Sequence, residues 1–257
     1  MSAAPAQAVD SAPFELGPPE GEGRAAALCL HGFTGTPYEV RSVAETLAAR
    51  GIRCRGPALP GHNTTPDELA RVSYADWLDH ARGEALALRA RHERVFAVGM
   101  SMGGLVSLSL AAEGAFDALA VAGTPLGLRQ PIPLLVPWLK HLRPFSRKRG
   151  GADIRDAAAR ERHPGYEVLP LAGVHELLRL QAHVGPRLGA VSVPLLVAHG
   201  ALDRTADPRD AQRILDAVSA GERELHICER SGHVVTVDHD APQLAAAVAD
   251  FFDRQLA

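Results

Sequence analysis

The sequence predicts an α/β domain in which helices flank a mostly parallel central sheet. Short apolar runs alternate along the 257 residues with segments whose apolar side chains recur at helical spacing. A chain of this length with 46% hydrophobic residues can bury one large core. One stretch rich in proline and glycine, residues 125–190, interrupts the alternation. We expect it to form a small helical cap without strands, inserted before the late strands.

The first elements form a strand, a helix and a second strand. Residues 25–30 are a continuous apolar run of strand length. Apolar side chains then recur at helical spacing over residues 40–48, and Gly51 ends this helix. Residues 52–55 supply the next strand. This order is a βαβ unit, which favours a parallel sheet.

The remaining core continues the same alternation. A longer amphipathic helix is predicted over residues 74–90, where Ser73 and Asp76 have the spacing of an N-terminal capping box. Further strands are expected at residues 95–98, 118–122, 194–198 and 224–228, and further helices near residues 104–112, 208–219 and 241–256. In such open sheets, ligands bind at the carboxyl ends of the strands.

The domain organisation follows from these elements. Residues 1–23 are predicted to be a flexible N-terminal arm, because residues 1–19 are rich in Ala, Pro and Ser and lack the basic start and apolar segment of a secretory signal. Residues 24–124 and 191–257 are the two parts of the core, and residues 125–190 are the cap.

Composition and charge argue against several classes of function. The net charge of −3 provides no general footprint for nucleic acid, and no apolar stretch approaches the length of about 18 residues that spans a membrane. The three cysteines, Cys29, Cys54 and Cys228, lie in apolar runs without CxxC spacing and are interpreted as buried thiols. We expect a soluble, cytoplasmic protein that uses no metal and no cofactor.

The cap is the basic part of the chain. It carries 11 Lys and Arg residues against 5 Asp and Glu residues. The run Arg147, Lys148 and Arg149 is interpreted as a solvated face. Weak contact of this run with an anionic membrane surface or an acidic partner is the alternative.

Residues 99–103 read Gly-Met-Ser-Met-Gly and join a predicted strand to a predicted helix. A strand, a sharp turn and a helix therefore meet at Ser101, which is the context of a nucleophile elbow. Glycine is needed at positions 99 and 103, because a Cβ there would collide with the neighbouring strand or helix. Ser101 is the predicted nucleophile, and a flexible glycine–serine loop is the alternative.

A serine hydroxyl needs a general base within hydrogen-bond reach and a carboxylate that orients the base. Asp203 follows the apolar run 193–198, and His233 follows the run 225–228 in a Ser-Gly-His loop. Ser101, Asp203 and His233 each lie just beyond a strand, in the chain order expected for a nucleophile elbow. We predict that these three residues are catalytic.

Rival residues fit these roles less well. Asp207 precedes Pro208 and is interpreted as the N-cap of the following helix. Asp238 lies beyond His233, against the expected order. Several of the 12 histidines lie near strands, but only His233 combines a late position with the Ser-Gly-His loop.

Acyl transfer also needs two N–H donors for the oxyanion, each worth about 3 kcal/mol. One is expected to be the backbone N–H of Met102, directly after the nucleophile. The other is expected from the turn at residues 31–37, His-Gly-Phe-Thr-Gly-Thr-Pro, with Phe33 as the donor. A plain glycine turn leading into the next helix is the alternative interpretation.

Five motifs together resemble the bacterial carboxylesterase and monoacylglycerol lipase family of α/β-hydrolases, over about residues 25–255. They are His-Gly-Phe-Thr-Gly at residues 31–35, Leu-Pro-Gly-His at 59–62, Gly-Met-Ser-Met-Gly-Gly at 99–104, His-Gly-Ala-Leu-Asp at 199–203 and Ser-Gly-His at 231–233. The resemblance implies the α/β-hydrolase fold, a triad of Ser101, Asp203 and His233, and an oxyanion hole formed by the amides of Phe33 and Met102. Asn63 departs from the family pattern, in which glycine is common at this position.

We therefore predict a metal-free serine hydrolase that cleaves carboxylic esters through an acyl-enzyme. The resemblance implies short to medium acyl esters or monoacylglycerols as substrates. A thioesterase, an amidase or a hydrolase of carbon–carbon bonds would use the same triad, and a small-molecule binding protein without turnover is the remaining alternative. The expected partner is a small ester, with no nucleic acid and no integral membrane segment.

Apolar residues of the cap have enough surface to line an acyl pocket, or else to pack the cap onto the core. Leu135 and Trp138 are the predicted substrate-binding residues. The full set is Leu126, Leu128, Ile132, Leu134, Leu135, Val136 and Trp138.

Overall fold

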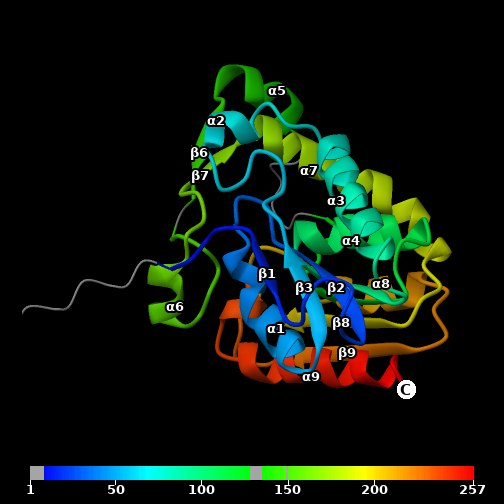
Figure 1. Cartoon of the computed structure of the whole chain (residues 1–257). Coiled ribbons are helices and arrows are strands. Elements are labelled where there is room, and N and C mark those ends of the chain that lie inside the picture. The colour runs from blue at the N-terminus through cyan, green and yellow to red at the C-terminus, as the bar shows by residue number, and fades with distance from the viewer. Residues whose placement is uncertain (1–8, 128–134, 149) are drawn as a thin grey trace, which may run out of the picture.

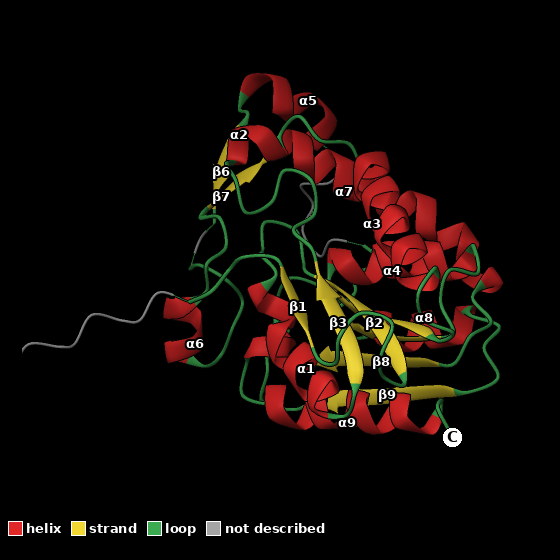
Figure 2. Ribbon diagram, in the orientation of Figure 1, coloured by secondary structure: helices red, strands yellow, loops and turns green. Residues whose placement is uncertain are grey.

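A seven-stranded sheet forms the centre of the computed structural model, which describes residues 9–127, 135–148 and 150–257. The strand order is β1-β3-β2-β4-β5-β8-β9, and every neighbouring pair is parallel except β1 with β3. The strands are β1 (Phe14–Leu16), β2 (Ala25–Leu30), β3 (Ile52–Gly56), β4 (Val95–Met100), β5 (Ala118–Ala122), β8 (Leu195–Gly200) and β9 (Arg223–Cys228). The predicted α/β class and mostly parallel sheet are confirmed (Figures 1 and 2).

Helices cover both faces of this sheet. They are α1 (Tyr38–Ala49), α3 (Tyr74–Arg89), α4 (Met102–Ala112), α8 (Asp210–Ala217) and α9 (Ala241–Arg254), whereas the short helix α2 (Pro66–Leu69) lies beside the cap. In Figure 1, α1 and α9 lie together below the sheet, and α3, α4 and α8 lie on its other side. Side chains alternate between the two faces, so Val95 and Ala97 pack on the α3 and α4 side while Phe96 stacks on Phe252 of α9.

The helix α3 begins where the sequence predicts. The Ser73 hydroxyl accepts a hydrogen bond from the Asp76 N–H, and the Asp76 carboxylate accepts one from the Ser73 N–H. This capping box satisfies N–H groups that have no partner within the helix. The predicted capping box is confirmed.

The predicted flexible arm, residues 1–23, is corrected between residues 14 and 16. Phe14 pairs with Gly56 of β3 and is only 7% exposed. A Cβ at Gly56 would overlap the Phe14 ring, so the glycine makes room for this contact. This pairing could not be predicted from the sequence, because a three-residue strand is too short to show an alternating pattern of apolar residues. Residues 1–8 of the predicted arm lie outside the described residues.

Between β5 and β8 the chain departs from the core, as predicted for the cap. It forms α5 (Val136–Leu142), β6 (Phe145–Arg147), α6 (Ala157–Arg162), β7 (Val168–Pro170), α7 (Leu171–Val184) and a 3₁₀ helix (Gly185–Ala190). The antiparallel pair β6 and β7 corrects the expectation of a cap without strands. Of the cap residues named above, Leu128, Ile132, Leu134 and Arg149 lie outside the described residues.

No helix in the described part of the chain has both the length and the apolar character that crossing a membrane requires. The cytoplasmic location stays a prediction. The three cysteines are buried free thiols, as the sequence predicts.

Two glycine-to-alanine substitutions in helices should have opposite effects on stability. A Cβ at Gly103 would lie 2.2 Å from the carbonyl oxygen of Leu30, so Gly103→Ala should destabilise the fold by about 1–3 kcal/mol. Nothing lies within 4 Å of a Cβ at Gly83, so Gly83→Ala should stabilise it by about 0.5–1 kcal/mol. Thermal unfolding followed by circular dichroism measures both, at about 2–4 °C per kcal/mol. An unchanged Tm for Gly103→Ala would show that the turn is not close-packed.

Candidate active site

Ser101 occupies the sharp turn between β4 and α4. Its φ of +54° and ψ of −112° lie in a backbone region that residues other than glycine rarely adopt. Glycine allows β4 and α4 to approach each other closely at this turn, because a Cβ at Gly99 would lie 2.5 Å from the carbonyl oxygen of Gly103. The Ser101 N–H donates to the carbonyl of Ala122 in β5 (2.8 Å), which fixes the turn to the sheet. The serine thus lies at the carboxyl end of a central strand.

The three predicted catalytic side chains contact one another in series. The hydroxyl of Ser101 lies 2.8 Å from Nε2 of His233, and Nδ1 of His233 lies 2.8 Å from Oδ2 of Asp203. Each comes from the loop after a different parallel strand, β4, β8 or β9, so the fold brings together residues 132 positions apart. A carboxylate only accepts, so Nδ1 of His233 carries the proton and Nε2 faces the hydroxyl as an acceptor.

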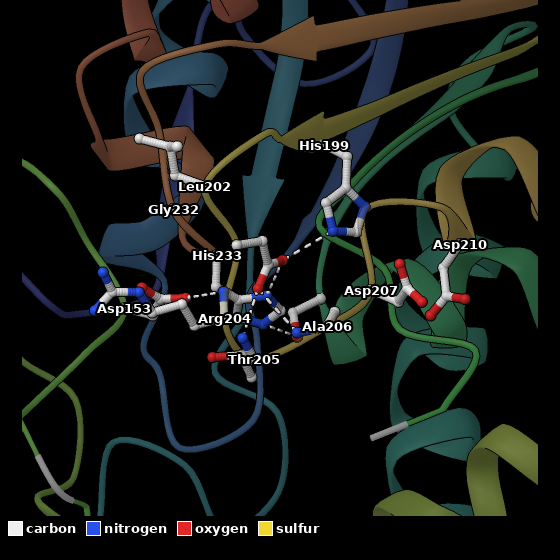
Figure 3. Close-up of polar contacts among 12 residues, drawn as sticks. Asp153, His199, Leu202, Arg204, Thr205, Ala206, Asp207, Asp210, Gly232 and His233 are labelled. Carbon is white, nitrogen blue, oxygen red and sulfur yellow. Dashed lines mark hydrogen bonds and ion pairs between the residues drawn. The ribbon is translucent and has the colours of Figure 1, made fainter. Parts of the chain in front are cut away.

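The carboxylate of Asp203 is fully occupied by donors. Its Oδ1 accepts from the N–H groups of Thr205 (2.7 Å) and Ala206 (2.8 Å). Its Oδ2 accepts from Nδ1 of His233 and also from Nε2 of His199 (2.8 Å), whose ring is labelled in Figure 3. Burial raises the pKa of Asp203, but the facing His233 and these hydrogen bonds lower it well below its usual range. The group therefore stays charged.

The imidazole of His233 responds to this charge. Burial lowers its pKa, but the charge and hydrogen bond of Asp203, with a smaller contribution from Asp153, outweigh burial and raise the pKa above its ordinary value of 6.5. His233 is thereby a stronger base than an exposed histidine. Such a base suits proton transfer from a serine hydroxyl.

His199 is a further polar residue of this site, and its contact with Asp203 was not predicted from the sequence. Its side chain is fully buried, and its Nδ1 has no hydrogen-bond partner among the described residues. The signal was present in the His-Gly-Ala-Leu-Asp motif, because two polar residues four positions apart at a strand end can meet across the turn.

Neither rival aspartate contacts His233. Asp207 lies apart from the cluster in Figure 3 and pairs with Arg209 at 2.6 Å. The helix α8 begins at Asp210 with Arg209 as its N-cap, so the predicted N-cap role of Asp207 is wrong; its carboxylate instead accepts from the Arg209 N–H in the preceding turn.

Asp238 holds the loop that carries His233. It accepts hydrogen bonds from the N–H of Gly232 in that loop and from the N–H groups of Arg155 and Asp156 in the cap, at 2.7, 2.7 and 2.8 Å. The cap is thus attached directly to the histidine loop.

The predicted oxyanion residues flank the nucleophile. Met102 is the first residue of α4, where N–H groups have no carbonyl partner within the helix. Gly32 approaches Ser101 so closely that a Cβ on it would lie 3.3 Å from Cβ of Ser101. Phe33 is the next residue in the chain after Gly32. His31 supports this turn: its Nε2 accepts from the Leu59 N–H (3.1 Å), which leaves Nδ1 to donate to the Gly32 carbonyl (2.9 Å).

The departure from the family pattern at Asn63 has a simple explanation. Asn63 has a φ of +56°, in the left-handed region that glycine adopts freely. Asparagine tolerates this region better than most residues. The loop therefore keeps a conformation that glycine would favour.

The cap residues differ in their surroundings. Leu135 and Trp138 are 57% and 76% exposed, so their predicted role in binding substrate stays a prediction. Their neighbour Val136 is buried against α7. Lys148 corrects the interpretation of residues 147–149 as a solvated face, because it is half-buried and donates to the hydroxyl of Thr34 (2.5 Å).

Residues 21–240 match the family model described as serine aminopeptidase, S33 (Hydrolase_4). The chain belongs to this α/β-hydrolase family. A thermostable monoacylglycerol lipase of Bacillus sp. (strain H-257) is 30% identical over 234 residues, which cover 90% of this chain and 92% of the relative. A carboxylesterase of Bacillus subtilis (strain 168) is 26% identical, covering 90% of this chain and 94% of the relative.

Solved structures agree with this assignment. A structure from work on LipS and LipT, two metagenome-derived lipolytic enzymes, has a TM-score of 0.88 and 26% identity, and covers 95% of this chain and 98% of that chain. A monoacylglycerol lipase of Paleococcus ferrophilus has the same fold, with a TM-score of 0.82, 16% identity, and coverage of 96% of this chain and 100% of that chain. The chain is an α/β hydrolase of the esterase and monoacylglycerol lipase type.

Asp203 and Asp207 form a matched pair for testing which carboxylate orients His233. Asp203→Asn should lower kcat by about 10⁴-fold, because an amide in place of the carboxylate favours the wrong imidazole tautomer and does not stabilise the imidazolium. Asp207→Asn should leave kcat within a few-fold, since its partner is Arg209. Steady-state kinetics on purified variants measures both, and the reverse result would refute the assignment of Asp203.

The raised pKa of His233 sets the direction of the pH dependence. If His233 accepts the serine proton, as the sequence predicts, kcat/KM should fall as the pH falls through this raised pKa, with a midpoint above 6.5. Removing the Asp203 charge removes the main cause of the rise, so the residual activity of Asp203→Asn should have its midpoint at lower pH. A profile of kcat/KM against pH measures both midpoints. Identical midpoints would show that Asp203 does not act on the ionising group.

Proposed function

We propose that this α/β hydrolase cleaves carboxylic esters through an acyl-enzyme formed on Ser101. The proposal depends chiefly on one observation: the Ser101 hydroxyl, at the tip of a strained turn, lies 2.8 Å from a ring nitrogen of His233. The similarity to a carboxylesterase and to a monoacylglycerol lipase favours esters over amides as substrates.

In the first half of the reaction, Oγ of Ser101 attacks the ester carbonyl carbon while its proton passes to Nε2 of His233. Asp203 stabilises the resulting imidazolium. The oxyanion accepts hydrogen bonds from the N–H groups of Phe33 and Met102. The intermediate collapses, the bond to the alcohol oxygen breaks, and His233 returns its proton to the leaving alcohol. Water then attacks the acyl-enzyme by the same steps and releases the acid.

The proposed substrates are short to medium acyl esters or monoacylglycerols. Phe33 follows Gly32, which approaches Ser101, and the Phe33 ring packs against the cap helix α7 at Gly173. The exposed Leu135, at the N-cap of α5, and Trp138 on α5 add apolar surface from the same insertion. We propose a small ester as the main partner, with weak contact between the basic cap and an anionic membrane surface as a second, separate interaction.

A fluorophosphonate probe tests the nucleophile, because only an activated serine reacts quickly with it. We expect one label, on Ser101, located by peptide mass spectrometry, and no label on Ser101→Ala. The same preparation should hydrolyse p-nitrophenyl esters and monoacylglycerols much faster than aminoacyl p-nitroanilides, and EDTA should leave the rate unchanged. A label on another serine, or preferential cleavage of the anilides, would refute the proposal.

Trp138 tests whether the cap selects the acyl chain. Because its side chain is 76% exposed, Trp138→Ala should not unfold the protein. It should change the preferred acyl length of p-nitrophenyl esters, by about 0.8 kcal/mol for each methylene that loses its contact, while the rate on p-nitrophenyl acetate stays within a few-fold. Leu86→Ala on α3, 63% exposed, is the matched control. An unchanged profile in folded Trp138→Ala would mean that other residues contact the acyl chain.

A further inference from the structure

The turn that carries Phe33 is folded around a buried carboxylate. Glu39, in the first turn of α1, is 4% exposed, and its Oε2 accepts a hydrogen bond from the Gly32 N–H at 2.7 Å. Gly35 leaves the space for this side chain, because a Cβ there would lie 2.3 Å from Oε1 of Glu39. The mechanism proposed above gives Glu39 no role. Burying a carboxylate costs free energy unless the carboxylate is well hydrogen-bonded, so the position of Glu39 inside the turn that carries Phe33 needs an explanation.

The second partner of Glu39 comes from the cap. Nε2 of His163, at the end of α6, lies 2.8 Å from Oε1 of Glu39, and both side chains are 5% exposed. The Gly165 N–H donates to Nδ1 of His163 (3.3 Å), so the proton on Nε2 is directed at the carboxylate. Burial raises the pKa of Glu39, but the His163 hydrogen bond and further contacts lower it to about 2. Glu39 is therefore a charged link between the cap and the Gly32 amide.

The cap holds the same turn at a second point. Thr34 has a φ of +62°, a conformation that costs a β-branched residue about 1–2 kcal/mol. Two cap residues contact it: the Tyr166 N–H donates to its carbonyl (2.9 Å), and the Lys148 ammonium donates to its hydroxyl (2.5 Å). Burial lowers the pKa of Lys148 to about 8. Cap contacts therefore help to hold Thr34 in this conformation.

These contacts lie on either side of one peptide group. The Phe33 N–H belongs to the peptide between Gly32 and Phe33. The carbonyl of this peptide, from Gly32, accepts a hydrogen bond from His31. On the preceding side, the Gly32 N–H donates to Glu39, and on the following side Thr34 is bound by residues of the cap. The direction of the Phe33 N–H is thus set by groups that the cap contacts.

We propose that the cap positions the oxyanion hole through His163 and Glu39, and so contributes to the chemical step as well as to substrate choice. Both are positioning residues, since neither contacts the reacting atoms. The inference rests on the ester hydrolysis proposed above. If it is correct, loosening this link weakens binding of the transition state and leaves binding of the ground-state ester nearly unchanged.

His163 variants test the link. His163→Phe keeps a ring but removes the donor, whereas His163→Gln places an amide N–H near the position of Nε2. Glu161→Gln, an exposed neighbour on α6, is the control. The measurements are kcat and KM on p-nitrophenyl butyrate, and the inhibition constant of a trifluoromethyl ketone, which forms an oxyanion on the nucleophile.

We expect His163→Phe to lower kcat by about 10–100-fold and to weaken the ketone by a similar factor, with KM within about twofold. His163→Gln should recover most of both losses, and Glu161→Gln should match the parent enzyme. A folded His163→Phe that keeps its kcat and its affinity for the ketone would overturn the proposal. So would a loss of kcat without any loss of affinity for the ketone.

A double-mutant cycle gives the same test without changing the cap. Gly35→Ala forces the Glu39 carboxylate to move, so it should lower kcat in the parent enzyme and cost little more in a Glu39→Ala background. Additive losses would overturn the proposal, even if His163→Phe does not fold. Failure of the parent enzyme to hydrolyse esters or to label at Ser101 is a separate result, which would remove the proposed function and this inference with it.

Discussion

Ser101 can face His233 only because its backbone is held at a φ of +54° between β4 and α4. That conformation requires glycine on either side, since side chains at positions 99 and 103 would enter the backbone of α4 and of β2. The cost of the strained turn is offset by the surrounding sheet, whose strands β2, β4 and β5 are almost fully buried. The rest of the site is arranged around this fixed hydroxyl, and the parallel topology supplies each partner from the end of another strand.

Two buried carboxylates then organise the polar groups near the serine. Asp203 orients His233 and is itself held by His199 and by two backbone amides. Glu39 lies inside the turn that carries Phe33, where its carboxylate accepts hydrogen bonds from the Gly32 N–H and from His163. Both carboxylates are buried, so water screens their interactions little and their orientation is held by their hydrogen-bond partners. Pre-organised charge of this kind is what acyl transfer needs, because the site does not have to reorganise as the oxyanion forms.

Local patterns in the sequence predicted the parts of this arrangement that depend on neighbouring residues. The apolar runs predicted strands β2, β3, β4, β5, β8 and β9 to within about two residues, and the elbow motif predicted the collisions at Gly99 and Gly103. Contacts between distant segments leave no such pattern: His163 contacts Glu39 across 124 positions, and Phe14 of β1 pairs with Gly56 of β3. Lys148 was misinterpreted for the same reason, because a run of basic residues does not reveal that one of them is turned inward onto Thr34.

Pre-steady-state kinetics with an acid quench decides whether Ser101 forms a covalent acyl-enzyme. We expect a burst of p-nitrophenol close to one equivalent per enzyme when deacylation is the slower step, and an acyl mass increment on the peptide that contains Ser101 in the quenched sample. Ser101→Ala should show neither. An enzyme that turns over esters but carries no acyl group on Ser101 after the quench, or carries it on another residue, would rule out this mechanism.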